Sequence, residues 1–183
     1  MNGVFLWRDA LGYFGDEIEP HAKALSEATN STYGLLVCRS AQGGQTLMVN
    51  RDGGHAERRL MLSSLWTRDI DYAISDWYPH LSQPMVVLLA INRSPCPDCA
   101  HLLAAALHAL DRKFALRCGQ QHFVLASLGL YKGPGFADKR GQPDTSTERG
   151  FQELREAGWK PCVLDFGRGL TRRGDQLLEY LKY

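Results

Sequence analysis

Two short motifs contain the residues of this chain whose types and spacing suit metal-dependent chemistry. The first is His55-Ala56-Glu57, and the second is Pro95-Cys96-Pro97-Asp98-Cys99. One imidazole and two thiolates form a ligand set suited to Zn²⁺, and three protein ligands leave the fourth position of a tetrahedral site open for water. A zinc ion lowers the pKa of bound water to about 7 and so supplies hydroxide at neutral pH. The motifs therefore predict a catalytic metal site with His55, Cys96 and Cys99 as ligands.

Glu57 is the residue expected to move protons at this site. It follows His55 by two positions, which is too near for a comfortable ligand on the same helical turn but near enough to reach water on the metal. A carboxyl group at that place acts first as general base and then as general acid. Each motif is expected where a strand gives way to a helix, and the positive end of a helix favours the thiolate form of cysteine.

The cysteine pair could also serve in either of two alternative roles. A fourth ligand such as His101, two residues after Cys99, would complete the zinc coordination and make the site structural. A C-x-x-C pair can also be a redox disulfide, although this would leave the His-Ala-Glu motif unexplained. The remaining cysteines, Cys38, Cys118 and Cys162, lie singly in apolar stretches and are expected to be buried, reduced thiols.

The chain around the motifs alternates strand-like and helix-like segments. Apolar runs predict strands at 33–39, 45–50, 85–91, 123–130 and 161–166. Helical periodicity is expected within 5–29, 55–66, 95–113, 148–158 and 174–181. A turn at 41–44 makes the first two strands a hairpin, whereas helical connections make the later strands parallel. The predicted fold is α/β, with three α/β/α layers and a mixed five-stranded sheet whose fourth and fifth strands are parallel.

Length and composition are those of one globular domain. The chain has 183 residues, of which 44% are hydrophobic and 22% charged, and its formal net charge is +1. These values exclude a disordered chain and a grossly basic nucleic-acid binder, but they allow a local basic groove. The apolar runs are far shorter than the roughly 20 residues that span a bilayer, so no membrane partner is expected. We expect a single domain, 1–183, with an N-terminal helical segment over 1–30 and the core over 31–183.

The same motifs resemble a known superfamily. H-x-E followed by P-C-x-x-C is the signature of the zinc-dependent nucleobase deaminases. Residues 91–100 (INRSPCPDCA) are similar to the Ser-Pro-Cys-x-x-Cys-Ala segment of the AID/APOBEC polynucleotide cytidine deaminases, and 151–166 (FQELREAGWKPCVLDF) resemble their helix–Ala-Gly–strand segment. Tyr131 stands where that family ends its fourth strand with a tyrosine, whereas Arg93 replaces a tryptophan common there. The likeness covers roughly 33–166, and bacterial deaminase toxins share the same core.

The resemblance implies a cytidine-deaminase-like fold with one zinc ion per chain. The implied reaction is hydrolytic deamination of cytosine to uracil in single-stranded DNA. The implied setting is a bacterial toxin, delivered as part of a larger secreted chain, acting in the cytoplasm and neutralised by an immunity protein. The polynucleotide preference rests on the helix expected between the last two strands, where free-nucleoside enzymes of the superfamily have a hairpin. Open alternatives are RNA, a free nucleoside, nucleotide or base, and an inactive zinc-bound binding module.

Five residues near the motifs are candidates for substrate contacts: Asn50, Ala56, Arg93, Ser94 and Tyr131. An amide at Asn50 suits the ribose or the base, and a turn-forming role is its alternative. Ser94 and Arg93 suit a base or a phosphate, and Ser94 could instead be a helix N-cap. Tyr131 is expected near the mouth of the base pocket.

Basic residues form three clusters, at Arg58-Arg59, at Lys132, Lys139 and Arg140, and at Arg168, Arg172 and Arg173. Such clusters can bind the backbone of a single strand while aromatic side chains stack on its bases. The alternative is that they are ordinary solvated charges.

Overall fold

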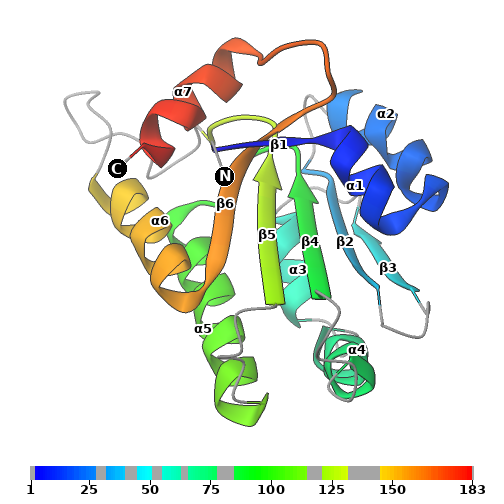
Figure 1. Cartoon of the computed structure of the whole chain (residues 1–183). Coiled ribbons are helices and arrows are strands. Elements are labelled where there is room, and N and C mark those ends of the chain that lie inside the picture. Colours follow the sequence, from blue (N-terminus) through cyan, green and yellow to red (C-terminus); the bar gives the residue numbers. More distant parts are fainter. Residues whose placement is uncertain are drawn as a thin grey trace.

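A mixed six-stranded sheet forms the centre of the computed structural model, which describes residues 3–27, 32–39, 45–50, 55–62, 66–77, 85–114, 121–131 and 145–182 (Figure 1). The strands lie in the order β1-β6-β5-β4-β2-β3. Their bounds are β1 (Val4–Leu6), β2 (Gly34–Arg39), β3 (Gln45–Asn50), β4 (Met85–Ile91), β5 (Gln121–Ser127) and β6 (Trp159–Asp165). β2 is antiparallel to β3 and β4, whereas β5 is parallel to β4 and β6. The predicted mixed sheet with its last two strands parallel is confirmed.

Helices cover both faces of this sheet. On one face lie α1 (Trp7–Phe14) and α2 (Glu19–Glu27), joined by the 3-10 turn η1 (Asp16–Ile18). The other face carries α3 (Ala56–Leu62), the π-helical turn η2 (Trp66–Ile70), α4 (Asp71–Trp77), α5 (Pro97–Phe114), α6 (Thr145–Ala157) and α7 (Arg172–Leu181). Figure 1 shows α1 and α2 on the near side of the sheet and α3 behind it. The three-layer α/β/α prediction is therefore confirmed.

β4 is the central strand, and its sequence explains its position. All seven of its residues are buried. Side chains alternate between the faces of a strand. Val86 and Leu88 accordingly pack with α1 and α2, whereas Val87 and Leu89 pack with the helices of the opposite layer. A strand buried on both faces needs an unbroken apolar run, and the MVVLLAI sequence supplies it.

The N-terminal segment differs from the prediction at its start. The periodicity of 5–29 predicts only helices, but Val4, Phe5 and Leu6 form β1, which pairs in parallel with residues 163–165 of β6. The Val163 N–H also donates a hydrogen bond of 2.8 Å to the Gly3 carbonyl. Three residues are too few to show a period, and this pairing joins distant parts of the chain. β1 therefore adds a sixth strand to the five that the sequence predicts.

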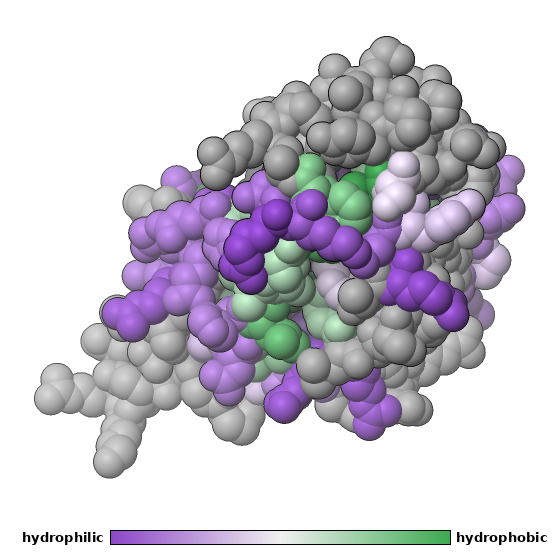
Figure 2. All heavy atoms as spheres, turned by 90° about the horizontal axis from the view of Figure 1, so that it is seen from below, coloured by the Kyte–Doolittle hydropathy of each residue, from purple (hydrophilic) through white to green (hydrophobic). Residues whose placement is uncertain are grey.

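Among the described residues on the side seen in Figure 2, hydrophilic side chains predominate. Purple side chains surround a small hydrophobic area there. Within the described ranges, the large hydrophobic side chains that are exposed are Tyr13 and Tyr72. None of the helices in these ranges is long and apolar enough to cross a membrane.

Candidate metal centre

The side chains of His55, Cys96 and Cys99 meet at one point, as the sequence predicts. Their ligand atoms all lie within 4.8 Å of one another. The Nδ1 atom of His55 is 3.4 Å from the sulfur of Cys96 and 3.2 Å from that of Cys99. The two sulfurs are buried, with residue exposures of 8% and 3%, whereas the His55 side chain is 42% exposed. The cluster is therefore open to solvent on the histidine side.

Two helix starts bring these residues together. His55 directly precedes α3, and its carbonyl accepts the first helical hydrogen bond, from Arg59 N–H at 3.2 Å. Cys96 directly precedes α5, and its carbonyl accepts from Ala100 N–H at 2.9 Å. Cys99 lies in the first turn of α5, so both sulfurs face the same side of the helix start. The structure thus confirms that both motifs lie where a helix begins after a strand.

Gly34 allows α3 to approach the sheet closely enough for this meeting. A Cβ atom on Gly34 would lie 2.9 Å from the Cβ of Ala56 and 3.1 Å from a methyl of Leu60. Real Cβ atoms do not approach other carbons so closely, so any side chain at Gly34 would displace α3. Because Ala56 lies between His55 and Glu57, its contact with Gly34 sets the position of both functional side chains. The sequence placed Ala56 among the substrate contacts, and the structure shows it buried at this helix–sheet contact.

The two thiols of the centre differ in acidity because they hydrogen-bond to each other. The bond from Cys99 lowers the pKa of the Cys96 thiol to about 6, and His55 contributes to the same effect. The bond to Cys96, together with burial, raises the pKa of Cys99. Both cysteines are free. At neutral pH the metal-free pair therefore carries one thiolate, which is the form that binds a metal.

Cys38 and Cys162 behave differently from the pair. Both are buried, and burial raises the pKa of each thiol to about 12. The prediction that these single cysteines are buried thiols is confirmed, and Cys118 lies outside the described residues.

Glu57 lies beside the ligands and is almost completely buried. Its side chain is 3% exposed, and its Oε1 atom is 3.8 Å from His55 Nδ1. Its Oε2 atom is buried without a hydrogen-bond partner in the described part of the protein. Burial raises the pKa of Glu57, although a backbone hydrogen bond, Cys99 and His55 oppose this effect. A buried carboxylate oxygen with unused capacity needs a polar partner, such as water or a substrate group.

The donor set fits zinc. With Zn–N and Zn–S bonds of roughly 2.0–2.1 and 2.3 Å, a tetrahedral site separates nitrogen and sulfur by about 3.5 Å. The distances of 3.4 and 3.2 Å from His55 Nδ1 to the sulfurs of Cys96 and Cys99 are close to this value. One imidazole and two thiolates are also a composition that zinc prefers.

His101 does not join the cluster. Its side chain is 76% exposed, and its Nδ1 atom contacts Glu153 Oε2 at 3.2 Å. The described residues that could hold a metal together are His55, Cys96 and Cys99. The alternative prediction, a structural zinc site with His101 as its fourth ligand, is therefore wrong.

Tyr131 and Arg93 lie at the open side of the centre. The rings of Tyr131 and His55 are 6.3 Å apart between centroids, at 46°. Burial raises the pKa of the Tyr131 hydroxyl, charges on Cys96, Cys99 and Glu57 add to the increase, and Arg93 opposes it. The fold thus brings Tyr131 next to His55 and places Arg93 close enough to act on the Tyr131 hydroxyl. Asn50 ends β3 opposite Gly34, and its side chain lies outside the described part.

Ser94 has a different local role from either of those predicted. Its side chain is buried and accepts a hydrogen bond of 2.9 Å from Tyr131 N–H. Its own N–H donates to the Gly129 carbonyl at 2.8 Å. The residue directly before α5 is Cys96, so Ser94 is not the N-cap of that helix. Contact of Ser94 with a substrate remains a prediction.

Asn92 is a structural residue that the sequence analysis missed. It is buried directly after β4, where its side-chain oxygen accepts from Tyr33 N–H at 3.0 Å. Its N–H in turn donates to the Tyr33 carbonyl at 3.2 Å. The pair of bonds holds the loop after β4 against the start of β2. A polar residue following an all-apolar strand was the available signal.

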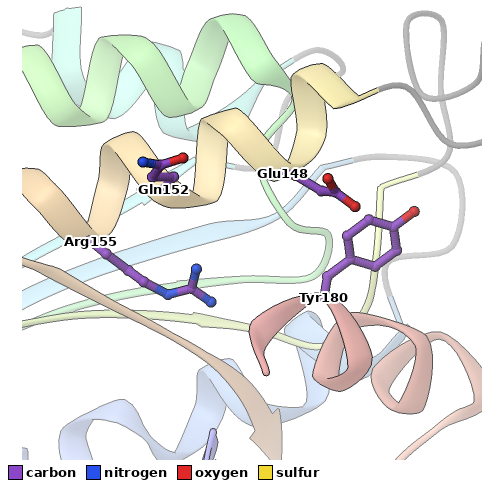
Figure 3. A pocket seen from close by; sticks show the side chains of 4 residues that line it. All are labelled: Glu148, Gln152, Arg155 and Tyr180. Atoms are coloured by element: carbon purple, nitrogen blue, oxygen red, sulfur yellow. The ribbon is translucent and has the colours of Figure 1, made fainter. Parts of the chain in front are cut away.

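Two cavities lined by described residues lie away from the centre. One, of about 470 Å³, opens between α6 and α7 and is lined by Glu148, Gln152, Arg155 and Tyr180 (Figure 3). Figure 3 shows the Tyr180 hydroxyl and the Glu148 carboxylate near each other, with Arg155 at the other end of the pocket. The second, of about 540 Å³, is bordered by α2 and by the loop before α7. Neither includes a metal ligand.

No protein-family model and no curated protein matches this chain.

Proposed function

We propose that this protein is a zinc-dependent deaminase that converts cytosine to uracil in single-stranded DNA. The observation that carries the proposal is one arrangement of four side chains. His55, Cys96 and Cys99 converge within 4.8 Å, and the buried carboxyl of Glu57 lies 3.8 Å from the His55 ring nitrogen. A binding module has no need of a buried proton carrier beside its metal, so the arrangement favours an enzyme over an inactive zinc protein.

The chemistry of the residues fits hydrolysis. A zinc ion on these three ligands would supply a Lewis acid and ionise water at neutral pH. Water adds to the ring carbon that bears the amino group, and the bond from that carbon to the amine breaks, which releases ammonia. Glu57 accepts a proton from the water and passes it to the ring nitrogen. It then takes the remaining proton from the hydroxyl now on the ring carbon, which becomes the carbonyl, and delivers that proton to the departing amine. Its burial keeps the carboxyl close to the reacting atoms and away from bulk water.

Two features support a base that belongs to a polynucleotide. Tyr131 offers an aromatic wall at the open side of the centre, and Arg93 lies near its hydroxyl. The helix α6 lies between β5 and β6, and these strands are parallel. In the superfamily that the sequence resembles, this arrangement accompanies polynucleotide and tRNA substrates. Duplex DNA is expected to be a poor substrate, because extruding a paired base costs a few kcal/mol.

The test is formation of uracil by the purified zinc-loaded protein. Single-stranded DNA, duplex DNA, RNA and free cytidine are supplied at equal concentration. We expect single-stranded DNA to react fastest. Faster turnover of free cytidine would replace the polynucleotide proposal with a free-nucleoside one, and faster turnover of RNA would replace DNA.

Glu57→Ala separates the chemistry from metal binding. The variant should keep its zinc and its fold, because Glu57 is not a ligand, and should lose activity by at least about 10²–10⁴-fold. Glu153→Ala is the matched control, because Glu153 also contacts a histidine, His101, but lies outside the centre. Near-normal turnover by Glu57→Ala would contradict the mechanism.

The proposed biological setting is a bacterial toxin that acts on DNA in the cytoplasm and is neutralised by an immunity protein. Expression in bacteria should then reduce growth and produce C-to-T changes in the genome. Glu57→Ala should do neither. Equal toxicity of both proteins would show that deamination is not the toxic activity.

A further inference from the structure

The first turn of α7 carries two arginines in positions that helix stability does not explain. Arg172 and Arg173 are the first two residues of this helix, after the N-cap Thr171, and both are exposed. The start of a helix is its positive end, so cations there are unfavourable. Within the described part of the chain, no ion pair joins Arg168, Arg172 or Arg173 to an acidic side chain. Asp175 also lies in this first turn but forms no ion pair with them in the described part, so both guanidinium groups are available to an external anion.

Several other basic residues of the described chain lie at the opposite end of a helix. Arg59 lies in the last turn of α3, and Arg112 and Lys113 lie in the last turn of α5. A cation is stabilised at that end of a helix. Single arginines also lie in first turns, Arg8 beside Asp9 in α1 and Arg58 beside Glu57 in α3, so the start of α7 is distinguished by its two adjacent cations.

The backbone ties the start of α7 to the segment that ends in Tyr131. The Leu130 N–H donates to the Arg173 carbonyl at 3.1 Å, and the Thr171 hydroxyl donates to the Leu128 carbonyl at 3.4 Å. A Cβ on Gly129 would lie only 2.6 Å from that of Arg173. Only a glycine at 129 allows this contact.

The same segment is fixed to the metal centre on its other side. The Gly129 carbonyl accepts from Ser94 N–H at 2.8 Å, and the ring of Tyr131 faces His55. The arginines and the aromatic wall are thus attached to one short stretch, 128–131. A strand whose base stacks on Tyr131 would have its neighbouring phosphates near this helix start.

We infer that Arg172 and Arg173 bind backbone phosphates of single-stranded DNA beside the target cytosine; this inference rests on the proposed function. Guanidinium groups suit phosphate because their planar N–H donors match its oxygens in pairs. Arg168, in the loop between β6 and α7, is a third cation at the same edge. An acidic protein is the rival occupant of this surface.

The test compares two double variants that remove the same charge. Arg172→Gln/Arg173→Gln changes the proposed surface. Arg39→Gln/Arg112→Gln is the control, because Arg39 ends β2 and Arg112 lies in the last turn of α5, both at the far end of the molecule from Cys96. Binding of a fluorescein-labelled single strand of about 12 nucleotides is followed by fluorescence anisotropy at several salt concentrations.

We expect the α7 variant to lose about tenfold or more in affinity near 0.1 M salt. The slope of log K against log salt should fall by about 1.4, since each phosphate contact on a single strand contributes roughly 0.7. Its melting temperature should stay the same or rise, because unfavourable cations leave the helix start. The control should bind like the unchanged protein. A purely structural role of these arginines would lower the melting temperature instead.

Unchanged affinity and salt slope in the α7 variant, or an equal loss in the control, would overturn the inference and favour the acidic-protein occupant. The anisotropy readout does not depend on turnover. A wild-type protein that forms no uracil but binds the strand through these arginines would therefore overturn the proposed function alone. A wild-type protein that forms uracil and binds equally well without them would overturn only this inference.

Discussion

The hydroxyl of Ser94 and the N–H of Tyr131 form a partly buried hydrogen bond of 2.9 Å that joins the ends of two neighbouring parallel strands. Ser94 follows β4, and Tyr131 follows β5. A second bond, from Leu128 N–H to the Ile91 carbonyl at 3.1 Å, continues the same contact beyond the strand ends. The ring of Tyr131 is therefore held toward His55 by a serine that need not touch any ligand itself.

Removing the Ser94 hydroxyl should loosen Tyr131 without emptying the metal centre. In Ser94→Ala, Tyr131 N–H loses its acceptor, which costs about 1 kcal/mol, the lower end of the range for a buried group, because the bond is only partly buried. We expect KM for a DNA oligonucleotide to rise more than kcat falls, with zinc content unchanged. Tyr131→Ala should give the largest rise in KM, because it removes the ring itself and stacking is worth about 1–3 kcal/mol per base. Ser127→Ala, another buried serine, is the control, and an equal effect there would contradict the positioning role.

Zinc binding should depend on three residues and not on a second histidine, His101. The purified chain should carry about one zinc ion, and His55→Ala or Cys96→Ser should lose most of it. His101→Ala should keep it, because that side chain is exposed and contacts Glu153. Metal analysis of the purified variants checks this. Full zinc in Cys96→Ser, or its loss from His101→Ala, would show that the ligand set is wrong.

Among the four cysteines that the structure describes, Cys96 should be the reactive thiol of the metal-free protein, with a pH dependence of its own. The pKa of Cys96 is lowered to about 6, so its reactive thiolate is present at pH 7 and disappears as the pH falls below about 6. Cys38 and Cys162, whose pKa values are about 12, should remain unlabelled throughout. Iodoacetamide labelling followed by peptide mapping measures this. Bound zinc should protect Cys96 from labelling. Equal labelling of Cys96 with and without zinc would contradict the role of Cys96 as a ligand.

Gly34→Ala should disturb both stability and the site. The added methyl would lie 2.9 Å from Ala56, so α3 must move, at a cost of about 1–3 kcal/mol. His55 and Glu57 move with that helix, so zinc affinity should fall as well. Gly12→Ala is the control, because nothing lies within 4 Å of a Cβ there and Gly12 is inside α1. It should raise the free energy of unfolding by about 0.5–1 kcal/mol. Thermal unfolding measures the stability of both variants, and zinc titration measures their zinc affinity.

Local patterns in the sequence determined the chemistry of the centre. The ligand types, the i, i+2 spacing of His55 and Glu57, and the C-x-x-C spacing at a helix start are properties of a few consecutive residues. The unbroken apolar run of β4 likewise marked the central strand. Such patterns can be interpreted without knowing which segments pack together, because the direction of side chains follows from the period of the strand or helix.

Only the tertiary structure decided which distant segments support that centre. β1 exists because it pairs with β6, and Ser94 is a partner of Tyr131 because β4 and β5 are neighbours. The fit of Gly34 to Ala56 has the same origin. Hydrogen bonds and close contacts between segments depend on strand order and register, which no short stretch of sequence encodes by itself. The arginines of α7 looked like any solvated charges until the fold attached their helix to the segment that ends beside the metal ligands.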